Sequence, residues 1–146
     1  MKSIHKKFCR IILIVSLLMV VSACKDSTDK YPFFLKYEAD DNLEMYHIGH
    51  NSYEISAGGG TLRIIGSIDF TVYAVDVDDC RLAVDNTRET DACASDIVSL
   101  STVDTKNIQI TFHPNSTGKL RKIEIILHPK WDEDAKLAFW QFSPEL

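Results

Sequence analysis

The stretch NIQITFHPNSTGKLRKIEIIL, residues 107–127, contains two runs in which apolar and polar side chains alternate. Apolar residues occupy positions 108, 110 and 112, and again positions 123, 125 and 127. Successive side chains of a strand point to opposite faces of a sheet, so this period of two predicts two strands that each bury one face. Between them lies Pro114-Asn115-Ser116-Thr117-Gly118, whose residue types favour a turn.

The same alternation extends over most of the chain after residue 30. In residues 68–75 the alternation predicts a strand with positions 68, 70, 72 and 74 on its buried face and Val75 on its outer face. Weaker strand candidates are residues 33–37, 43–48, 53–56, 61–65, 81–84, 97–100 and 136–142. Residues 85–96 read as a long loop. Short strands separated by Gly, Pro, Asn and Asp predict an all-β domain over residues 31–146, an immunoglobulin-like antiparallel β-sandwich of about 7–9 strands.

Residues 1–23 have the organisation of a cleaved secretory signal peptide. Four basic residues precede an apolar run of 11 residues at positions 11–21, and Ser22-Ala23 follow. A membrane-spanning helix needs about 20 apolar residues, so this run is too short to be a permanent anchor. VSAC, at positions 21–24, resembles the bacterial lipobox, in which the cysteine is diacylated and becomes the first residue of the mature protein. The resemblance implies that Cys24 carries acyl chains such as palmitate.

The segment after the cleavage site predicts how the domain is held. Residues 24–30 contain no apolar residue after Cys24 and favour a flexible, solvated tether. Lys25-Asp26 resembles the charged segment that directs lipoproteins of Bacteroidetes-type bacteria to the cell surface. This resemblance implies an envelope protein anchored in the outer membrane, and the domain then faces either the periplasm or the cell surface.

The charge of the mature chain excludes several kinds of partner. The full chain has 16 basic and 21 acidic residues, and removal of the four basic leader residues leaves a net charge of −9. An acidic domain repels phosphate backbones, which argues against nucleic-acid binding. It also lacks a basic patch for anionic lipid head groups, so we expect membrane attachment through the lipid on Cys24.

Two cysteines remain in the mature domain, Cys80 and Cys93. Disulfides persist outside the cytosol, so an even pair in an exported domain predicts a bridge. It would close a loop of 14 residues. In the chain-entropy model such a loop contributes about 3 kcal/mol. The alternative is two free, partly buried thiols.

Three segments together resemble the BACON family of bacterial immunoglobulin-like modules: residues 53–75, residues 107–127 and residues 135–142. The family has an apolar strand and a Gly-rich turn, a "Pro-Asn-x-Thr, then Arg" hairpin and a last strand that closes on Gln. The matching positions in this chain are Ile55 to Gly60, Pro114, Asn115, Thr117, Arg121, Leu137, Phe139 and Gln141. The resemblance implies the sandwich architecture, an association with carbohydrate-active systems, and a role as a carbohydrate binder or a spacer.

Several short motifs suggest ligands but have simpler explanations. Gly58-Gly59-Gly60 precedes a strand rather than a helix, so it favours a hairpin turn over a phosphate cradle. His47 and His50 are three residues apart and would point to opposite faces of a strand, with no third zinc ligand nearby. The acidic residues that could gather calcium are Asp76, Asp78, Asp79 and Asp85. They lack the EF-hand pattern and favour a solvated turn, although a calcium site stays open as an alternative.

The sequence contains no serine-nucleophile motif. Glu38, Glu44 or Glu54 could pair with an aspartate for glycoside hydrolysis, but no spacing selects such a pair. Trp131, in the polar segment KWDED, is the candidate ligand contact, because sugars stack on exposed aromatic rings. Trp140 is out of phase with Leu137 and Phe139 and is expected on the opposite sheet face.

We therefore expect a non-catalytic, lipid-anchored envelope protein without cofactor or metal, whose sandwich binds a glycan or an envelope partner. A second hypothesis is a structural spacer or subunit of an envelope complex that has no ligand of its own. A third is a small envelope hydrolase that lacks a recognisable motif.

Overall fold

A computed structural model describes residues 32–85 and 93–144, and the side chains of residues 93 and 94 lie outside the description. Residues from Pro32 onward form one compact unit. Its described strands are β1 (Leu35–Ala39), β2 (Met45–Gly49), β3 (Ser52–Ile55), β4 (Gly60–Gly66), β5 (Phe70–Val77), β6 (Cys80–Leu82), β7 (Cys93–Ala94), β8 (Val98–Asp104), β9 (Asn107–Phe112), β10 (Arg121–Pro129) and β11 (Ala135–Gln141). Within the described part of the chain, no helix is long and apolar enough to cross a membrane.

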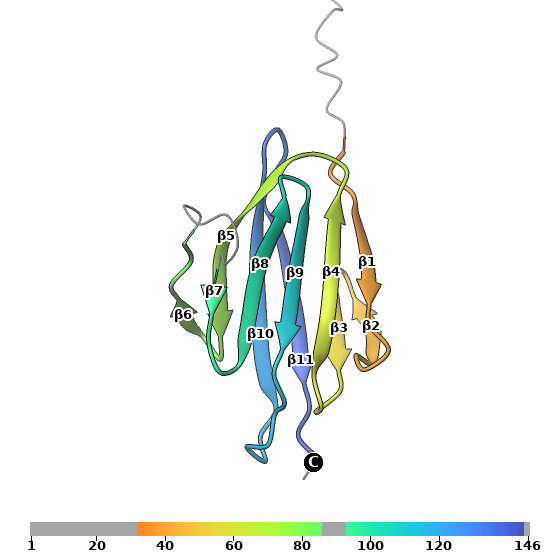
Figure 1. Ribbon diagram of the computed structural model, residues 1–146, viewed down its shortest axis with the longest axis vertical. Coiled ribbons are helices and arrows are strands. Elements are labelled where there is room, and N and C mark those ends of the chain that lie inside the picture. Colours follow the sequence, from red (N-terminus) through yellow and green to blue (C-terminus); the bar gives the residue numbers. More distant parts are fainter. Residues whose placement is uncertain (1–31, 86–92, 145–146) are drawn as a thin grey trace, which may run out of the picture. The chain divides into compact units, whose positions relative to one another are not determined.

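The strands form two sheets that face each other (Figure 1). One sheet has five strands in the order β1-β4-β9-β8-β7, and the other has six in the order β2-β3-β11-β10-β5-β6. The predicted all-β class is confirmed, and the arrangement fits an immunoglobulin-like sandwich. The described residues hold 11 strands rather than about 7–9. The short strands β6 and β7 contribute to the excess, and β7 lies in the segment predicted as a long loop.

One strand pair departs from the predicted antiparallel arrangement. Strand β3 pairs with β11 in parallel, whereas every other described pair is antiparallel. Because these two strands are far apart in the sequence, no tight turn forces them to run in opposite directions.

The inward faces of both sheets supply one apolar core. Its members include the alternating residues Ile108, Ile110, Phe112, Ile123, Ile125 and Leu127. Aromatic rings connect the two sheets through this core. The ring centroids of Phe112 and Phe139 are 4.9 Å apart, and Phe139 stacks on Tyr53 at 5.5 Å. Tyr53 also contacts Tyr37 of the opposite sheet at 5.2 Å.

A β-bulge at Tyr73 overturns part of the predicted alternation in β5. Val72 pairs with Leu127, but Ala74 pairs with Ile126, so β5 has one extra residue at this point. The extra residue reverses the phase of the strand, since cross-strand partners share a face. Val75, which was predicted to face outward, therefore joins the core. Ala74 pairs with Ile126 beyond the bulge and is buried, as predicted, at 0% exposed.

The two turns predicted as hairpins are instead connections between the sheets. The glycine triplet joins β3 of one sheet to β4 of the other, and residues 113–120 likewise join β9 to β10. The triplet does need its glycines. Gly59 and Gly60 have φ angles of 71° and 144°, and a Cβ on Gly59 would lie 2.0 Å from the carbonyl oxygen of Phe112.

Buried polar side chains organise the second of these connections. Asn115 and Gln141 are only 1% and 0% exposed. The Asn115 side-chain amide donates hydrogen bonds to the carbonyl oxygens of Lys119 at 2.8 Å and Gln141 at 3.1 Å. The Gln141 amide donates to the carbonyl oxygen of His113 at 2.8 Å, and its oxygen accepts from Arg121 at 3.2 Å. Asn115, Arg121 and Gln141 thus close one end of the core with hydrogen bonds.

Replacing Asn115 tests this network. Asn115→Ala should lower the free energy of unfolding by roughly 2–3 kcal/mol, because it leaves buried carbonyl groups without donors. Urea denaturation measures the loss. Ser116→Ala, at the exposed neighbouring position, is the control and should change stability by less than about 0.5 kcal/mol. Equal stability of the two variants would contradict a structural role for Asn115.

Candidate functional site

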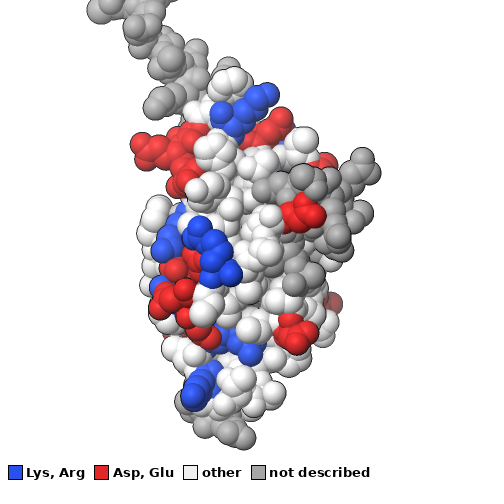
Figure 2. Space-filling view, turned by 90° about the vertical axis from the view of Figure 1, so that its left-hand side faces the viewer, with Lys and Arg blue, Asp and Glu red and all other residues white. Residues whose placement is uncertain are grey.

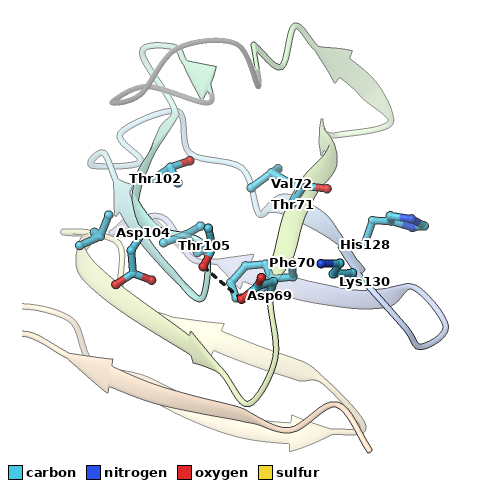
Figure 3. A pocket seen from close by; sticks show the side chains of 11 residues that line it. Asp69, Phe70, Thr71, Val72, Thr102, Asp104, Thr105, His128 and Lys130 are labelled. Carbon is cyan, nitrogen blue, oxygen red and sulfur yellow. Dashed lines mark hydrogen bonds between the residues drawn. The ribbon is translucent and has the colours of Figure 1, made fainter. Parts of the chain in front are cut away.

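A cleft of about 550 Å³ lies between the two sheets near one end of the sandwich (Figure 3). Strand β5 and the end of β10 form one wall, and the β8–β9 hairpin forms the other. Its lining residues are Asp69, Phe70, Thr71, Val72, Thr102, Val103, Asp104, Thr105, Ile108, His128 and Lys130. A volume of this size is typical of small-molecule sites.

The floor of the cleft is apolar and its rim is polar. Phe70, Val72 and Ile108 belong to the buried core and close the bottom of the cleft. Around the opening, carboxylates, hydroxyls, an imidazole and an ammonium group come from separate segments (Figure 3). An apolar surface surrounded by a few polar groups is the usual lining of a ligand site.

Hydrogen bonds join the segments around the cleft. The backbone N–H of Phe70 donates to the Thr105 carbonyl oxygen at 2.9 Å. The Thr105 hydroxyl donates to Asp69 Oδ1 at 3.1 Å, and the backbone N–H of Lys130 donates to the Asp69 carbonyl oxygen at 2.9 Å. The loop before β5, the β8–β9 turn and the end of β10 are therefore held together, which gives the cleft a defined shape before any ligand binds.

Two side chains of the rim, Asp104 and His128, have close polar partners. The backbone N–H of Lys106 donates to Asp104 Oδ1 at 2.8 Å and lowers the pKa of this carboxyl below its ordinary value, with help from Asn107. His128 Nδ1 lies 2.6 Å from Asp134 Oδ1. At neutral pH the rim thus presents an ionised Asp104, which accepts hydrogen bonds but donates none.

A second hollow, of about 370 Å³, lies between β1, the β2–β3 turn and the β10–β11 turn. Tyr37 lines it, and no hydrogen-bond partner of the buried Tyr37 hydroxyl is described. Burial, together with the nearby Tyr53, raises the pKa of Tyr37 above its ordinary value. This hollow carries no arrangement of groups that suggests a reaction.

The two tryptophans lie where the sequence placed them, but neither lines the cleft. Trp131 is 71% exposed in the turn between β10 and β11. It adjoins the cleft through Lys130, whose ammonium group lies 5.2 Å from the centroid of its ring. Trp140 faces outward from β11 and carries Lys122 over its ring at 5.3 Å. The role of Trp131 as a ligand contact stays a prediction.

The acidic residues near position 78 serve the β5–β6 hairpin. Asp78 and Asp79 form its two-residue turn with φ angles of 48° and 66°, which matches the favoured hairpin geometry. Asp78 also accepts a hydrogen bond from the backbone N–H of Lys122 at 2.8 Å. Asp76 accepts two from Arg81, at 2.7 and 2.9 Å.

Ion pairs cover part of the outer face of the six-stranded sheet, seen at the left of Figure 2. Glu124 Oε1 lies 3.0 Å from Lys122 Nζ and 2.8 Å from Lys136 Nζ. Partial burial raises the pKa of Glu124, but the hydrogen bonds from Lys136 and Lys122 outweigh it and leave the pKa below its ordinary value. Together with the pair of Asp76 and Arg81, these contacts make the face an alternation of charges.

The other candidate residues are not gathered into a site. His47 packs on Tyr53, and His50 lies in the turn after β2. Among the described residues, no group of three His, Cys, Asp or Glu side chains is placed to hold a metal ion. The candidate acids Glu38, Glu44 and Glu54 line neither hollow. Glu38 is instead paired with Lys36 at 2.7 Å.

The cysteines are only partly within the described structure. Cys80 lies on β6 and is exposed, with no disulfide among the described residues, and Cys93 belongs to β7, whose side chains are not described. These strands end their respective sheets at the same side of the sandwich (Figure 1). A Cys80–Cys93 bridge would therefore join the two sheets at that edge, and it stays a prediction. Cys24 lies outside the described residues.

Sequence reasoning missed the cleft residues Asp69, Thr105, His128 and Lys130. They come from three segments, the loop before β5, the β8–β9 turn and the end of β10, and these segments meet only when the sheets pack. No local spacing marks them, so no motif could have found them.

Comparisons with known proteins bear on the fold. No protein-family model matches the sequence, and no curated protein matches it. The structure is similar to the NMR structure of a protein from Bacteroides thetaiotaomicron, with a TM-score of 0.59 and 11% identity over 83% of this chain and 97% of that one. At this identity the likeness supports the fold alone.

A second likeness is to a Bacteroides ovatus GH5 xyloglucanase in complex with a XXXG heptasaccharide. Its TM-score is 0.40 and the identity is 14%, over 74% of this chain and 19% of that chain. A likeness at this level adds nothing about fold or function.

Thiol labelling tests the predicted bridge. In protein exported by its native route, then denatured without reduction, Cys80 and Cys93 should both resist alkylation, because an oxidising compartment favours the disulfide. After reduction both should label, and mass spectrometry counts the additions. Labelling of both cysteines before reduction would show that the bridge is absent.

Proposed function

We propose that this protein is a lipid-anchored, non-catalytic binding module of the bacterial envelope, and that its cleft holds a glycan. The cleft between β5 and the β8–β9 hairpin is the observation that supports the proposal. Its apolar floor suits the apolar face of a sugar ring, and its polar rim suits the hydroxyl groups of the sugar. An envelope protein partner is the other ligand class that the sequence favours.

The chemical groups around the cleft favour ligand binding over catalysis. Glycoside hydrolysis needs a carboxylic acid with a raised pKa beside a second carboxylate. Asp104 instead has a lowered pKa, because it accepts a hydrogen bond from the backbone of Lys106. Asp69 is engaged by the Thr105 hydroxyl at 3.1 Å, which gives it a part in shaping the rim.

The amino-terminal segment supports the location. The basic, apolar and small residues up to position 23, followed by Cys24, favour export and lipid attachment. The resemblance of Lys25-Asp26 to a surface-export signal favours the outer membrane and a surface-exposed domain. The BACON-like pattern in the strands favours the same kind of bacterial envelope.

The anchor is tested by replacing its cysteine. Cys24→Ala should release the protein from the membrane fraction or leave the leader uncleaved, because the thiol is the site of acylation. Fractionation and the mass of the mature protein provide the readout, with Cys80→Ala as the matched control that should remain membrane-bound. Normal processing and membrane attachment of Cys24→Ala would refute the anchor.

The cleft is tested with the soluble mature chain, residues 25–146, on a glycan array and then by calorimetry with the best glycan. The double substitution Lys130→Ala and His128→Ala should lower affinity at least tenfold, or about 1.4 kcal/mol, because it removes two polar groups of the rim. Lys119→Ala with His50→Ala removes the same side-chain types outside the cleft and should leave affinity unchanged. Trp131→Ala, tested beside them, shows whether this ring contacts the ligand.

Two results would contradict the proposal. Equal binding by the cleft variant and its control would move the glycan site elsewhere. No binding to any glycan, with a stable protein complex recovered from membranes, would favour the structural subunit instead.

A further inference from the structure

One end of the sandwich, which we call the tether end, is formed by residues 32–34, the β4–β5 loop, the β8–β9 turn and the β10–β11 turn (Figure 1). It carries the two most exposed large apolar side chains of the described structure, Trp131 at 71% and Phe34 at 65%. Val103, at the end of β8, is 52% exposed at the same end. Exposed aromatic groups of this kind require an explanation when several gather on one surface.

These side chains stand on a rigid base. The backbone N–H of Phe34 donates to Ser67 Oγ at 3.0 Å, and Ser67 returns a backbone hydrogen bond to Phe34 at 2.9 Å. The neighbouring Phe33 N–H donates to Asp132 Oδ2 at 2.9 Å, which ties residues 33 and 34 to the turn that carries Trp131. The two exposed rings therefore belong to segments that hydrogen bonds hold together at this end of the sandwich.

The position of Pro32 limits which surface can meet the membrane. Seven residues separate Cys24 from Pro32. The eight Cα–Cα steps from Cys24 to Pro32 span at most about 29 Å when fully extended. Strand β10 alone has 9 residues and is about 30 Å long. The connection from β9 to β10 extends the sandwich further at the opposite end (Figure 1), so a domain standing on that end would hold Pro32 beyond the reach of the tether.

The chemistry of the tether end fits the head-group region of a bilayer. The ammonium group of Lys130 lies 5.2 Å from the centroid of the Trp131 ring. An aromatic ring beside an ammonium group suits an interface between an apolar region and water. The adjoining acidic residues Asp132 and Glu133 disfavour an anionic surface. The suitable partner is therefore a zwitterionic lipid surface.

Resting on the proposed lipid anchor, we propose that Trp131 and Phe34 insert into the interface of the bilayer that holds the acyl chains of Cys24. A short tether keeps the tether end at an effective concentration on the order of millimolar near that surface, so a contact whose dissociation constant lies below that concentration stays formed. Trp and Phe side chains favour this interfacial region. The opposite end, with Leu120 and Phe142, then points away from the membrane.

The test uses the lipidated mature protein, residues 24–146, reconstituted into phosphatidylcholine vesicles with brominated or unbrominated acyl chains. A Trp140→Phe variant reports on Trp131 alone, and a Trp131→Phe variant reports on Trp140 alone, since the chain has two tryptophans. Trp131 emission should shift to the blue and lose intensity in the brominated vesicles. Trp140, on the outer sheet face, should respond less.

Matched substitutions identify the surface that makes the contact. In the Trp140→Phe background, Phe34→Asp should reduce the quenching of Trp131, whereas Phe142→Asp at the opposite end should leave it unchanged. Circular dichroism of each variant confirms that the sandwich is intact. Equal effects of the two substitutions would overturn the proposed orientation.

Flotation of the vesicles separates the two levels of the proposal. Protein that floats with the vesicles but shows no quenching of Trp131 keeps its anchor and overturns the interfacial contact. Protein that does not float overturns the lipid anchor, and the contact with it.

Discussion

Burial of apolar side chains between the two sheets is the constraint on which the rest of the structure depends, and its centre is the contact of Phe112 with Phe139. Their ring centroids are 4.9 Å apart, and each residue is at most 1% exposed. Because β9 and β11 belong to different sheets, this contact holds the sheets face to face. Every other feature is placed by that packing, since turns and edges must close around a core whose thickness the side chains set.

The two ends of the core are closed in different ways. At one end, Asn115 and Gln141 are buried and satisfy backbone carbonyl groups, so this end is sealed by hydrogen bonds. Near the other end, the cleft lies between β5 and the β8–β9 hairpin. The proposed binding site and the proposed membrane contact thus belong to the same half of the domain, which would place a bound glycan near the surface that anchors the protein.

The limits of prediction can be seen in particular residues. The alternation at positions 108–112 and 123–127 correctly predicted which side chains enter the apolar core. The same rule failed for Val75, because the bulge at Tyr73 depends on the register with β10, which local sequence does not contain. The turns after β3 and β9 were recognised as turns, but their residues do not say whether the next strand pairs in the same sheet or crosses to the other one.

The sequence by itself determined the all-β class, the positions of most strands and the exposure of Trp131, because strand periodicity and turn chemistry are properties of neighbouring residues. Only the tertiary structure decided the order of the strands, the parallel pairing of β3 with β11, and the meeting of Asp69, Thr105 and Lys130 around the cleft. These features arise from contacts between residues tens of positions apart. The free energy that stabilises these contacts is gained only when the two sheets pack and exclude water from a common core. The sequence of a single segment therefore does not predict them.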